Sequence, residues 1–254
     1  MQNWHRKLDR RTPFRSGGDI GFDFSFAFQP IVDVRNRAIV SYEALVRGPR
    51  GEPSFEVFAQ VPRAKFPIFD ELCREKAIWL ASQLRIPNRL NLNLAPPGLY
   101  EVDVSITATF HASIHSGIPV ENIVFEVLES ENLTDQRNLL QYLQIIQDFG
   151  FKTAIDDFGV GYSGLKLLVQ YQPNIIKLDR ELISDIHNSP VKQSVFKGIQ
   201  QICNPLSIEI IAEGVETAEE YHWLQEAGIS IFQGFYFARP AFEALPDVAN
   251  RLFG

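Results

Sequence analysis

The chain has 254 residues, of which 45% are hydrophobic and 22% charged, as in an ordinary globular protein. Its formal net charge of −7 argues against binding to nucleic-acid polymers, so an anionic ligand would need a locally positive pocket. No apolar run reaches transmembrane length, and the basic start of the chain lacks the apolar segment of a signal peptide.

The polar start of the chain and its two cysteines indicate how the chain is organised. Residues 1–24 are predicted to form a leader or linker, and residues 25–254 a single domain without an internal linker or repeat. Cys73 and Cys203 lie in separate helical patterns and nothing pairs them, so reduced thiols and a cytoplasmic location are expected.

Short apolar runs rich in β-branched residues alternate with stretches of helical period. Strands are predicted, in chain order, at 26–33, 38–47, 90–94, 123–129, 152–157, 175–179, 208–215 and 230–238. Helical patterns fall at 69–84, 134–150, 191–203 and 217–228. The second of these begins at an N-cap, Thr134, and the last begins with a capping box formed by Thr217 and Glu220.

This alternation favours a largely parallel sheet covered by helices. Eight strands in a domain of this length suit a closed TIM-like barrel, with an open doubly wound sheet as the alternative. The first two predicted strands have no helix between them, so one strand is expected to run against the others.

Polar residues follow the predicted strands at the ends where a barrel of this type carries its chemistry. The residues at these ends are Glu43, Asn93, Glu126, Asp156, Asp157, Lys177, Asp179, Glu213 and Gln233. A single acid there would be read as a salt-bridged rim residue, but acids at successive strand ends favour a metal site, because a carboxylate in apolar sequence needs a partner. Ligands that are all oxygen favour Mg²⁺ or Mn²⁺ over Zn²⁺.

Histidines do not contribute to this set. His111 and His115 have the i, i+4 spacing of metal ligands, but they lack the glutamate of the H-E-x-x-H motif and a third ligand. They are predicted to lie on a solvated helix face.

Two adjacent aspartates suggest two metal ions. Asp156 could bridge the ions while Asp157 ligates one, an arrangement suited to hydrolysis of phosphate esters. Lys177 would supply a cation for the phosphate or the attacking water, and Arg47 could bind a phosphate oxygen bidentately.

The stretch "DDFGVGYSG" at 156–164 also has the G-x-G-x-x-G spacing of a dinucleotide-binding turn. A Rossmann-type dehydrogenase is therefore an alternative hypothesis. It is disfavoured because Asp156 and Asp157 would repel a pyrophosphate.

The segment "YEALVRG" at 42–48 resembles the signature of EAL domains, the cyclic di-GMP phosphodiesterases of bacterial signalling. The resemblance runs from "FQPIVD" to "QGFYFARP" and includes "NLNLAP", "FEVLES", "DDFGVGYSGL", "IIKLD" and "IAEGVET". It implies a TIM-like barrel with one antiparallel strand, and hydrolysis of cyclic di-GMP to linear pGpG with Mg²⁺ or Mn²⁺.

The resemblance also assigns roles at matching positions. One metal would be bound by Glu43, Asn93, Glu126 and Asp156, and the second by Asp156 and Asp157. Glu213 resembles the general base or ligand of the metal-bound water, and Lys177 the lysine that positions or activates the attacking water. Glu129 resembles the acid that holds the glycine-rich loop. The positions that would line the ligand site are Gln29, Leu45, Arg47, Glu216 and Gln233, with Asp179 a weaker candidate.

Two departures from the family pattern are visible. "NLAP" replaces the more usual N-V-S while keeping Asn93, and the loop reads "GVGYSGL" where "GTGYSSL" is commoner. Degenerate members of the family bind the dinucleotide or a protein without cleavage, so a catalytically silent cyclic di-GMP receptor that acts through a protein partner is the alternative. The resemblance further implies a homodimer, and a sensor or regulatory partner that the sequence does not identify.

Overall fold

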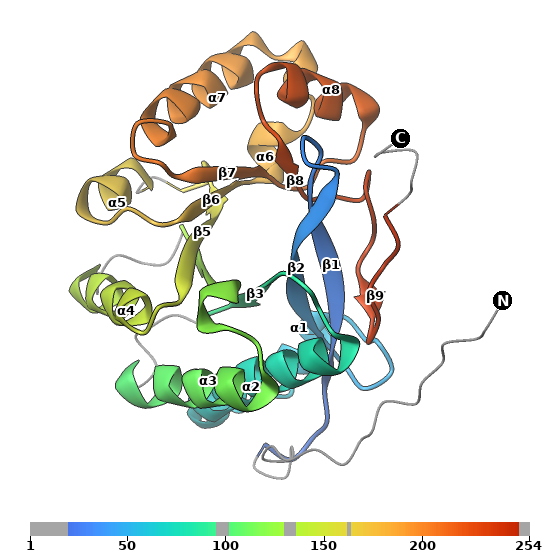
Figure 1. Ribbon diagram of the computed structural model, residues 1–254, viewed down its shortest axis with the longest axis vertical. Helices are drawn as coiled ribbons and strands as arrows, with labels where there is room; N and C mark the ends of the chain where they lie inside the picture. The colour runs from blue at the N-terminus through green and yellow to red at the C-terminus, as the bar shows by residue number, and fades with distance from the viewer. Residues whose placement is uncertain (1–19, 95–101, 130–135, 162–163, 249–254) are drawn as a thin grey trace, which may run out of the picture.

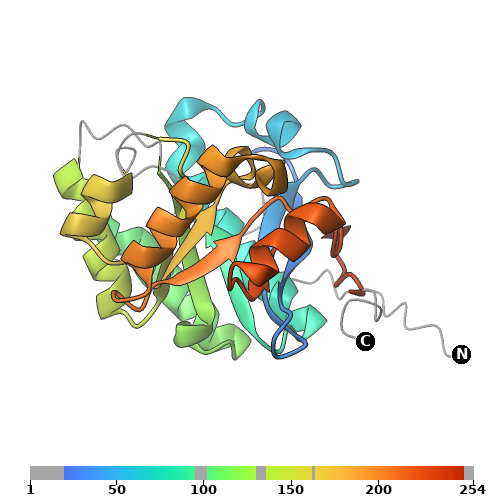
Figure 2. The ribbon, with the colours of Figure 1, turned by 90° about the horizontal axis from the view of Figure 1, so that it is seen from above.

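The computed structural model describes residues 20–94, 102–129, 136–161 and 164–248, and shows strands enclosed by helices (Figures 1 and 2). The strands are β1 Ser25–Asp33, β2 Ala38–Arg47, β3 Arg89–Asn93, β4 Ile123–Leu128, β5 Lys152–Phe158, β6 Ile175–Leu178, β7 Glu209–Ala212, β8 Ile231–Phe232 and β9 Ala241–Phe242. The α-helices are α1 Ser54–Phe58, α2 Phe66–Leu84, α3 Val102–Ser116, α4 Gln136–Asp148, α5 Gly164–Gln170, α6 Arg180–Ile183, α7 Pro190–Cys203 and α8 Ala218–Glu226. Short 3₁₀ turns are η2 Arg63–Lys65, η4 Val120–Asn122 and η6 Ile186–Asn188.

The sheet closes on itself as a barrel. Strands β2 to β8 pair in chain order and in parallel, and β1 closes the ring by pairing antiparallel with both β8 and β2. The short turn after Asp33 sends β2 back along β1, which is the physical reason for the single antiparallel strand. The predicted TIM-like barrel with one antiparallel strand is confirmed, and β9 is an additional short strand on β1.

The eight predicted strands are all present, and the last two are shorter than predicted. Beyond β7 and β8 the chain turns at Gly214, with φ of +66°, and at Gly234, where a Cβ would lie 2.0 Å from the Val215 carbonyl oxygen. The predicted capping box of α8 is confirmed, because Thr217 and Glu220 each bond the other's backbone amide. Thr134 lies outside the described residues.

Helices α1, α5 and α6 were not predicted, and α3 was expected only as the helix that carries His111 and His115. The described part of α3 is rich in threonine, isoleucine and other residues without strong helical preference, so its sequence carries only a weak helical signal. His111 and His115 lie exposed on this helix, as predicted. Helices α2 to α5, α7 and α8 surround the barrel and cover its outer surface (Figure 1).

Two apolar layers stabilise the barrel. The larger core lies between the strands and the surrounding helices, and the described part of the polar start, 20–24, joins it through buried Ile20 and Phe24. A second cluster inside the barrel consists of Ile31, Val124, Ala154, Ile175, Ile211 and Ile231. None of the described helices is long and apolar enough to cross a bilayer.

Substitution of Phe125 on β4 tests the assignment of the outer core. Its ring is fully buried and lies edge-on to Phe151 at 5.1 Å between centroids. Phe125→Ala should lower the free energy of unfolding by about 3–5 kcal/mol because it leaves a cavity. Urea unfolding measures this, and Phe55→Ala, at a side chain that is 69% exposed, should change it by less than about 0.5 kcal/mol. Equal effects of the two variants would contradict the assigned core.

Candidate active site

The polar residues of the site form the next layer inside the barrel after the inner apolar cluster. Side chains two residues apart on a strand face the same side, so the residue two positions after each inner apolar residue also points into the barrel. The pairs are Val124 and Glu126, Ala154 and Asp156, Ile175 and Lys177, Ile211 and Glu213, and Ile231 and Gln233. Because β1 runs the opposite way, Gln29 precedes Ile31 and reaches the same end of the barrel.

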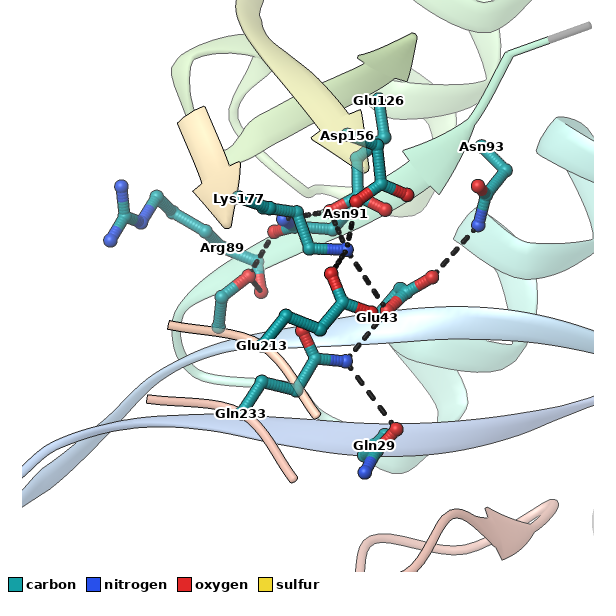
Figure 3. Close-up of polar contacts among 11 residues, drawn as sticks. Gln29, Glu43, Arg89, Asn91, Asn93, Glu126, Asp156, Lys177, Glu213 and Gln233 are labelled. Carbon is teal, nitrogen blue, oxygen red and sulfur yellow. Dashed lines mark hydrogen bonds and ion pairs between the residues drawn. The ribbon is translucent and has the colours of Figure 1, made fainter. Parts of the chain in front are cut away.

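Lys177 lies at the centre of the site (Figure 3). Its ammonium Nζ is fully buried and forms ion pairs with carboxylates from four other strands or their ends. The distances from Nζ are 3.3 Å to Glu43 Oε2, 3.1 Å to Glu126 Oε1, 3.0 Å to Asp156 Oδ1 and 3.0 Å to Glu213 Oε2. A single positive charge therefore faces four acids in a medium of low dielectric constant.

Glu43 is the most fully hydrogen-bonded of these acids. Asn93 Nδ2 donates to its Oε1 at 2.9 Å, and Gln233 Nε2 donates to its Oε2 at 2.6 Å. Burial alone would raise the pKa of Glu43, but Lys177 and these amides together lower it. Glu43 is therefore held as an ionised carboxylate.

Glu126, Glu213 and Lys177 also have shifted pKa values. Burial, and then the neighbouring Glu43 carboxylate, raise the pKa of Glu126 well above its usual value. Burial likewise raises the pKa of Glu213 well above its usual value, against the lowering effect of Lys177. Burial would lower the pKa of Lys177, but the surrounding acids raise it well above its ordinary value, so it stays charged.

The two adjacent aspartates lie where the pairing of β5 is irregular. The pairing of β5 with β6 shifts register between Ile155 and Phe158, and Asp157 has φ of +53°, in the left-handed region that aspartate tolerates. Burial, and then Asp156, raise the pKa of Asp157 from 3.8 to about 6.

The donor set fits a hard divalent cation. Glu43, Glu126 and Asp156 each present an oxygen within 4.8 Å of the others. Glu126 Oε2 is buried without a hydrogen-bond partner, which is costly for a carboxylate unless a cation takes that place. Oxygen ligands of this kind suit Mg²⁺, Mn²⁺ or Ca²⁺.

The glycine-rich loop surrounds a carboxylate of the protein itself. Glu129, which follows β4, accepts hydrogen bonds from the amides of Gly159 at 2.7 Å, Gly161 at 3.3 Å and Gly164 at 2.8 Å. A Cβ at Gly161 or Gly164 would lie 2.9 Å from Glu129 Oε1, so the loop needs glycine for this close approach. These amides already have an anion as partner, which counts against the alternative of a pyrophosphate-binding turn.

The remaining predicted ligand-lining residues lie around the carboxylate cluster. Leu45 and Arg47 line a cavity of about 390 Å³ that also reaches Glu43 and Asn93. Gln29 Nε2 donates to the Ala238 carbonyl oxygen at 3.2 Å, and Gln29 Oε1 accepts from Gln233 at 3.4 Å.

Two predicted residues have other partners at the rim. Asp179 caps α6 by accepting from the Glu181 amide, at 2.6 Å. Glu216 forms an ion pair with Arg180 at 3.0 Å and its side chain is 40% exposed, so it lies outside the buried cluster.

Sequence reasoning missed Asn91, which donates to Glu126 Oε1 at 2.7 Å. The alternation in "LNLNL" held the signal, since Asn91 lies two residues before Asn93 and must share its face. Sequence reasoning also missed Ser41, whose buried hydroxyl contacts Asn91. The signal was similar, since Ser41 lies two residues before Glu43 on β2.

Comparison with known proteins places the chain in a family. Residues 20–240 match the sequence profile of the EAL domain, and the protein belongs to the EAL domain family. The blue light- and temperature-regulated antirepressor BluF of Escherichia coli K12 is 32% identical over 88% of this chain and 56% of its own length. The cyclic di-GMP phosphodiesterase PdeR of the same strain is 30% identical over 87% of this chain and 34% of its own length. The chain thus spans about half or less of these relatives.

Solved structures agree with this assignment. A standalone versatile EAL protein from Vibrio cholerae O395, in its c-di-GMP-bound form, is 42% identical, with a TM-score of 0.88 over 92% of this chain and 98% of that one. Klebsiella pneumoniae BlrP1, in a manganese and cyclic di-GMP complex, is 38% identical, with a TM-score of 0.85 over 90% of this chain and 58% of that one.

The Lys177 cluster predicts a stability defect that metal corrects. Lys177→Met should lower the free energy of unfolding by about 3–5 kcal/mol in EDTA, because it leaves buried acids without a cation. Added Mn²⁺ should recover most of this loss. Denaturant unfolding measures both, with exposed Lys197→Met as the control. A Lys177→Met protein as stable as wild type in EDTA would contradict the role of this ion-pair cluster.

Asp157 predicts a pH dependence with a defined sign. An acid whose pKa is raised on folding, here from 3.8 to about 6, contributes less to stability as pH rises through that window. Asp157→Asn should therefore be more stable than wild type by about 1 kcal/mol at about pH 7.5 in EDTA, after allowance for solvent screening of a half-exposed group.

The difference between Asp157→Asn and wild type should vanish below about pH 4, where the aspartate is protonated in both states. Unfolding curves across this range are the measurement. Glu219→Gln, at an exposed acid on α8, should not change the pH dependence. A difference that grows toward acid would reverse the assigned sign.

Proposed function

We propose that this protein hydrolyses cyclic di-GMP to linear pGpG with the help of two divalent cations, Mg²⁺ or Mn²⁺. The observation that carries the proposal is the buried cluster of carboxylates at the barrel mouth, which holds an unpaired Glu126 oxygen and fits such a cation. Similarity to the cyclic di-GMP phosphodiesterase PdeR and to the Vibrio structure with bound c-di-GMP supports the substrate, and similarity to the Klebsiella complex with manganese and cyclic di-GMP supports the metal.

Under this proposal, Glu43, Asn93, Glu126 and Asp156 hold one cation, and Asp156 and Asp157 hold the second. The bound cations would lower the pKa of a water molecule and neutralise charge on the phosphate. Asp156 fits the bridging role because it lies in the buried cluster beside Glu126 and next in sequence to Asp157.

Glu213 and Lys177 would handle the attacking water. The Glu213 side chain is 26% exposed, the most of the four acids around Lys177, so it is the one that water reaches. Its raised pKa makes it a stronger base than an ordinary glutamate, suited to accept the proton of the water. Lys177 Nζ, 3.0 Å from Glu213 and from Asp156, would orient that water between them.

The rim residues would hold the dinucleotide. Arg47 can bind a phosphate oxygen, Leu45 lines the adjoining cavity, and Gln29 and Gln233 form a linked amide pair on the floor of the site. Glu216 and Asp179 are further candidates at the rim. Glu129 would position the glycine-rich loop beside the metal ligands.

Hydrolysis requires water to form a bond to phosphorus while the bond to one ribose 3′-oxygen breaks. Incubation with cyclic di-GMP and Mn²⁺ or Mg²⁺, followed by chromatography, should yield pGpG. No product with either metal, from folded protein, would overturn the proposal.

Asp156→Asn should lower kcat by more than about 100-fold, since losing a ligand should exceed the about 10- to 100-fold cost of losing an outer-shell partner. Steady-state kinetics measure this, with Glu219→Gln as a control of unchanged activity. Activity close to wild type in Asp156→Asn would contradict the bridging assignment.

The similarity to the antirepressor BluF supports a second candidate, a cyclic di-GMP receptor that acts through a protein partner. Such a receptor would work as a homodimer or together with a regulatory protein. Tight binding of cyclic di-GMP without turnover, and signalling that survives Glu43→Ala, would favour it. Calorimetry with cyclic di-GMP, read together with the chromatographic assay for pGpG, separates the two functions.

A further inference from the structure

Asn91 is a buried polar residue to which the proposed reaction gives no role. It lies on β3 inside the barrel, one layer below Asn93, and is fully buried (Figure 3). Its strand register places it beside Val124 on β4, two residues before Glu126. A buried amide at this depth is costly unless its hydrogen bonds are satisfied.

Both ends of the Asn91 amide have partners. Its Nδ2 donates to Glu126 Oε1 at 2.7 Å, and its Oδ1 accepts from the hydroxyl of Ser41 on β2. The same Ser41 oxygen lies 3.1 Å from the Arg89 carbonyl oxygen. Ser41, Asn91 and Glu126 thus form a continuous buried chain across three neighbouring strands.

The chemistry of these groups fixes the orientation of the amide. When Glu126 ligates a cation it is an ionised carboxylate, which only accepts hydrogen bonds, so the NH₂ end of Asn91 must face it. At the other end of the amide, the Ser41 hydroxyl can donate to Oδ1. In the reverse orientation, the Asn91 amide oxygen would instead face an oxygen of Glu126. Ser41 therefore supplies a donor for the Asn91 oxygen in the orientation that Glu126 requires.

These hydrogen bonds determine which oxygen of Glu126 remains available. Oε1 is occupied by Asn91 at 2.7 Å and by Lys177 at 3.1 Å, whereas Oε2 is buried without a hydrogen-bond partner. Outer partners of metal-ligating carboxylates orient the ligand, and their loss typically weakens metal binding by about 10- to 100-fold.

We propose that Asn91, held by Ser41, is the positioning residue that fixes Glu126 as a metal ligand and leaves Oε2 for the cation. This inference rests on the proposed metal site. It does not require that cyclic di-GMP be the substrate.

Calorimetric titration of the metal-free 254-residue chain with Mn²⁺ tests the proposal. Asn91→Leu keeps a similar volume but removes the donor, and should weaken Mn²⁺ binding by about 10- to 100-fold. Ser41→Ala should weaken it in the same direction by a smaller factor, and serves as the second variant if Asn91→Leu does not fold. Tyr171→Phe, which removes a buried 2.7 Å hydrogen bond to Thr153 away from the carboxylates, should leave the Mn²⁺ affinity unchanged.

Kinetics give an independent readout if the protein turns over cyclic di-GMP. Asn91→Leu should lower kcat at limiting Mn²⁺, recover as Mn²⁺ is raised, and leave KM for the dinucleotide within about twofold. This dependence of kcat on Mn²⁺ supports a positioning role, because a merely structural role would not change how kcat varies with Mn²⁺.

The outcomes are separable. Wild-type Mn²⁺ affinity in both Asn91→Leu and Ser41→Ala, with only a lower melting temperature, would overturn the assignment, as would a wild-type chain that binds no Mn²⁺. A wild-type chain that binds Mn²⁺ and leaves cyclic di-GMP intact would overturn the proposed hydrolysis while the Asn91 assignment stands.

Discussion

The buried ammonium of Lys177 and the acids around it form the interaction on which the site depends. Nζ is fully buried within 3.3 Å of four carboxylates, and the described strands bring those acids together from different parts of the chain. Like charges packed this closely repel one another unless a cation lies among them. Burial, together with the surrounding carboxylates that one lysine cannot balance, raises the pKa values of Glu126 and Glu213, and this excess of negative charge is why the site fits additional divalent cations.

The barrel makes this arrangement possible by separating stability from chemistry along its axis. The inner apolar cluster, with Ile175 and Ile211 among its members, fills the lower part of the barrel, and the polar side chains occupy the next layer. The outer core, where Phe125 packs, lies on the opposite face of the same strands. The costly burial of charge is therefore confined to one layer of a well-packed scaffold.

Membership of the EAL domain family and the geometry of the site point in one direction for function. The carboxylates form a buried cluster that fits a metal ion, the Glu129 carboxylate accepts hydrogen bonds from the glycine-rich loop, and Arg47 lines the adjoining cavity. The excess of acids in the chain as a whole is thus compatible with an anionic substrate, because bound cations would reverse the local charge.

The sequence by itself determined the strands, the barrel, the antiparallel first pair and the acids at strand ends, because alternation and strand-end position are local patterns. Tertiary structure alone decided which oxygens meet: that Lys177 contacts four acids, that Glu129 accepts from loop amides thirty or more residues away, and that Asn91 supports Glu126. It also decided the register shift between β5 and β6, at which Asp157 adopts a positive φ. Such contacts arise from strand register and barrel closure, which no local sequence pattern encodes.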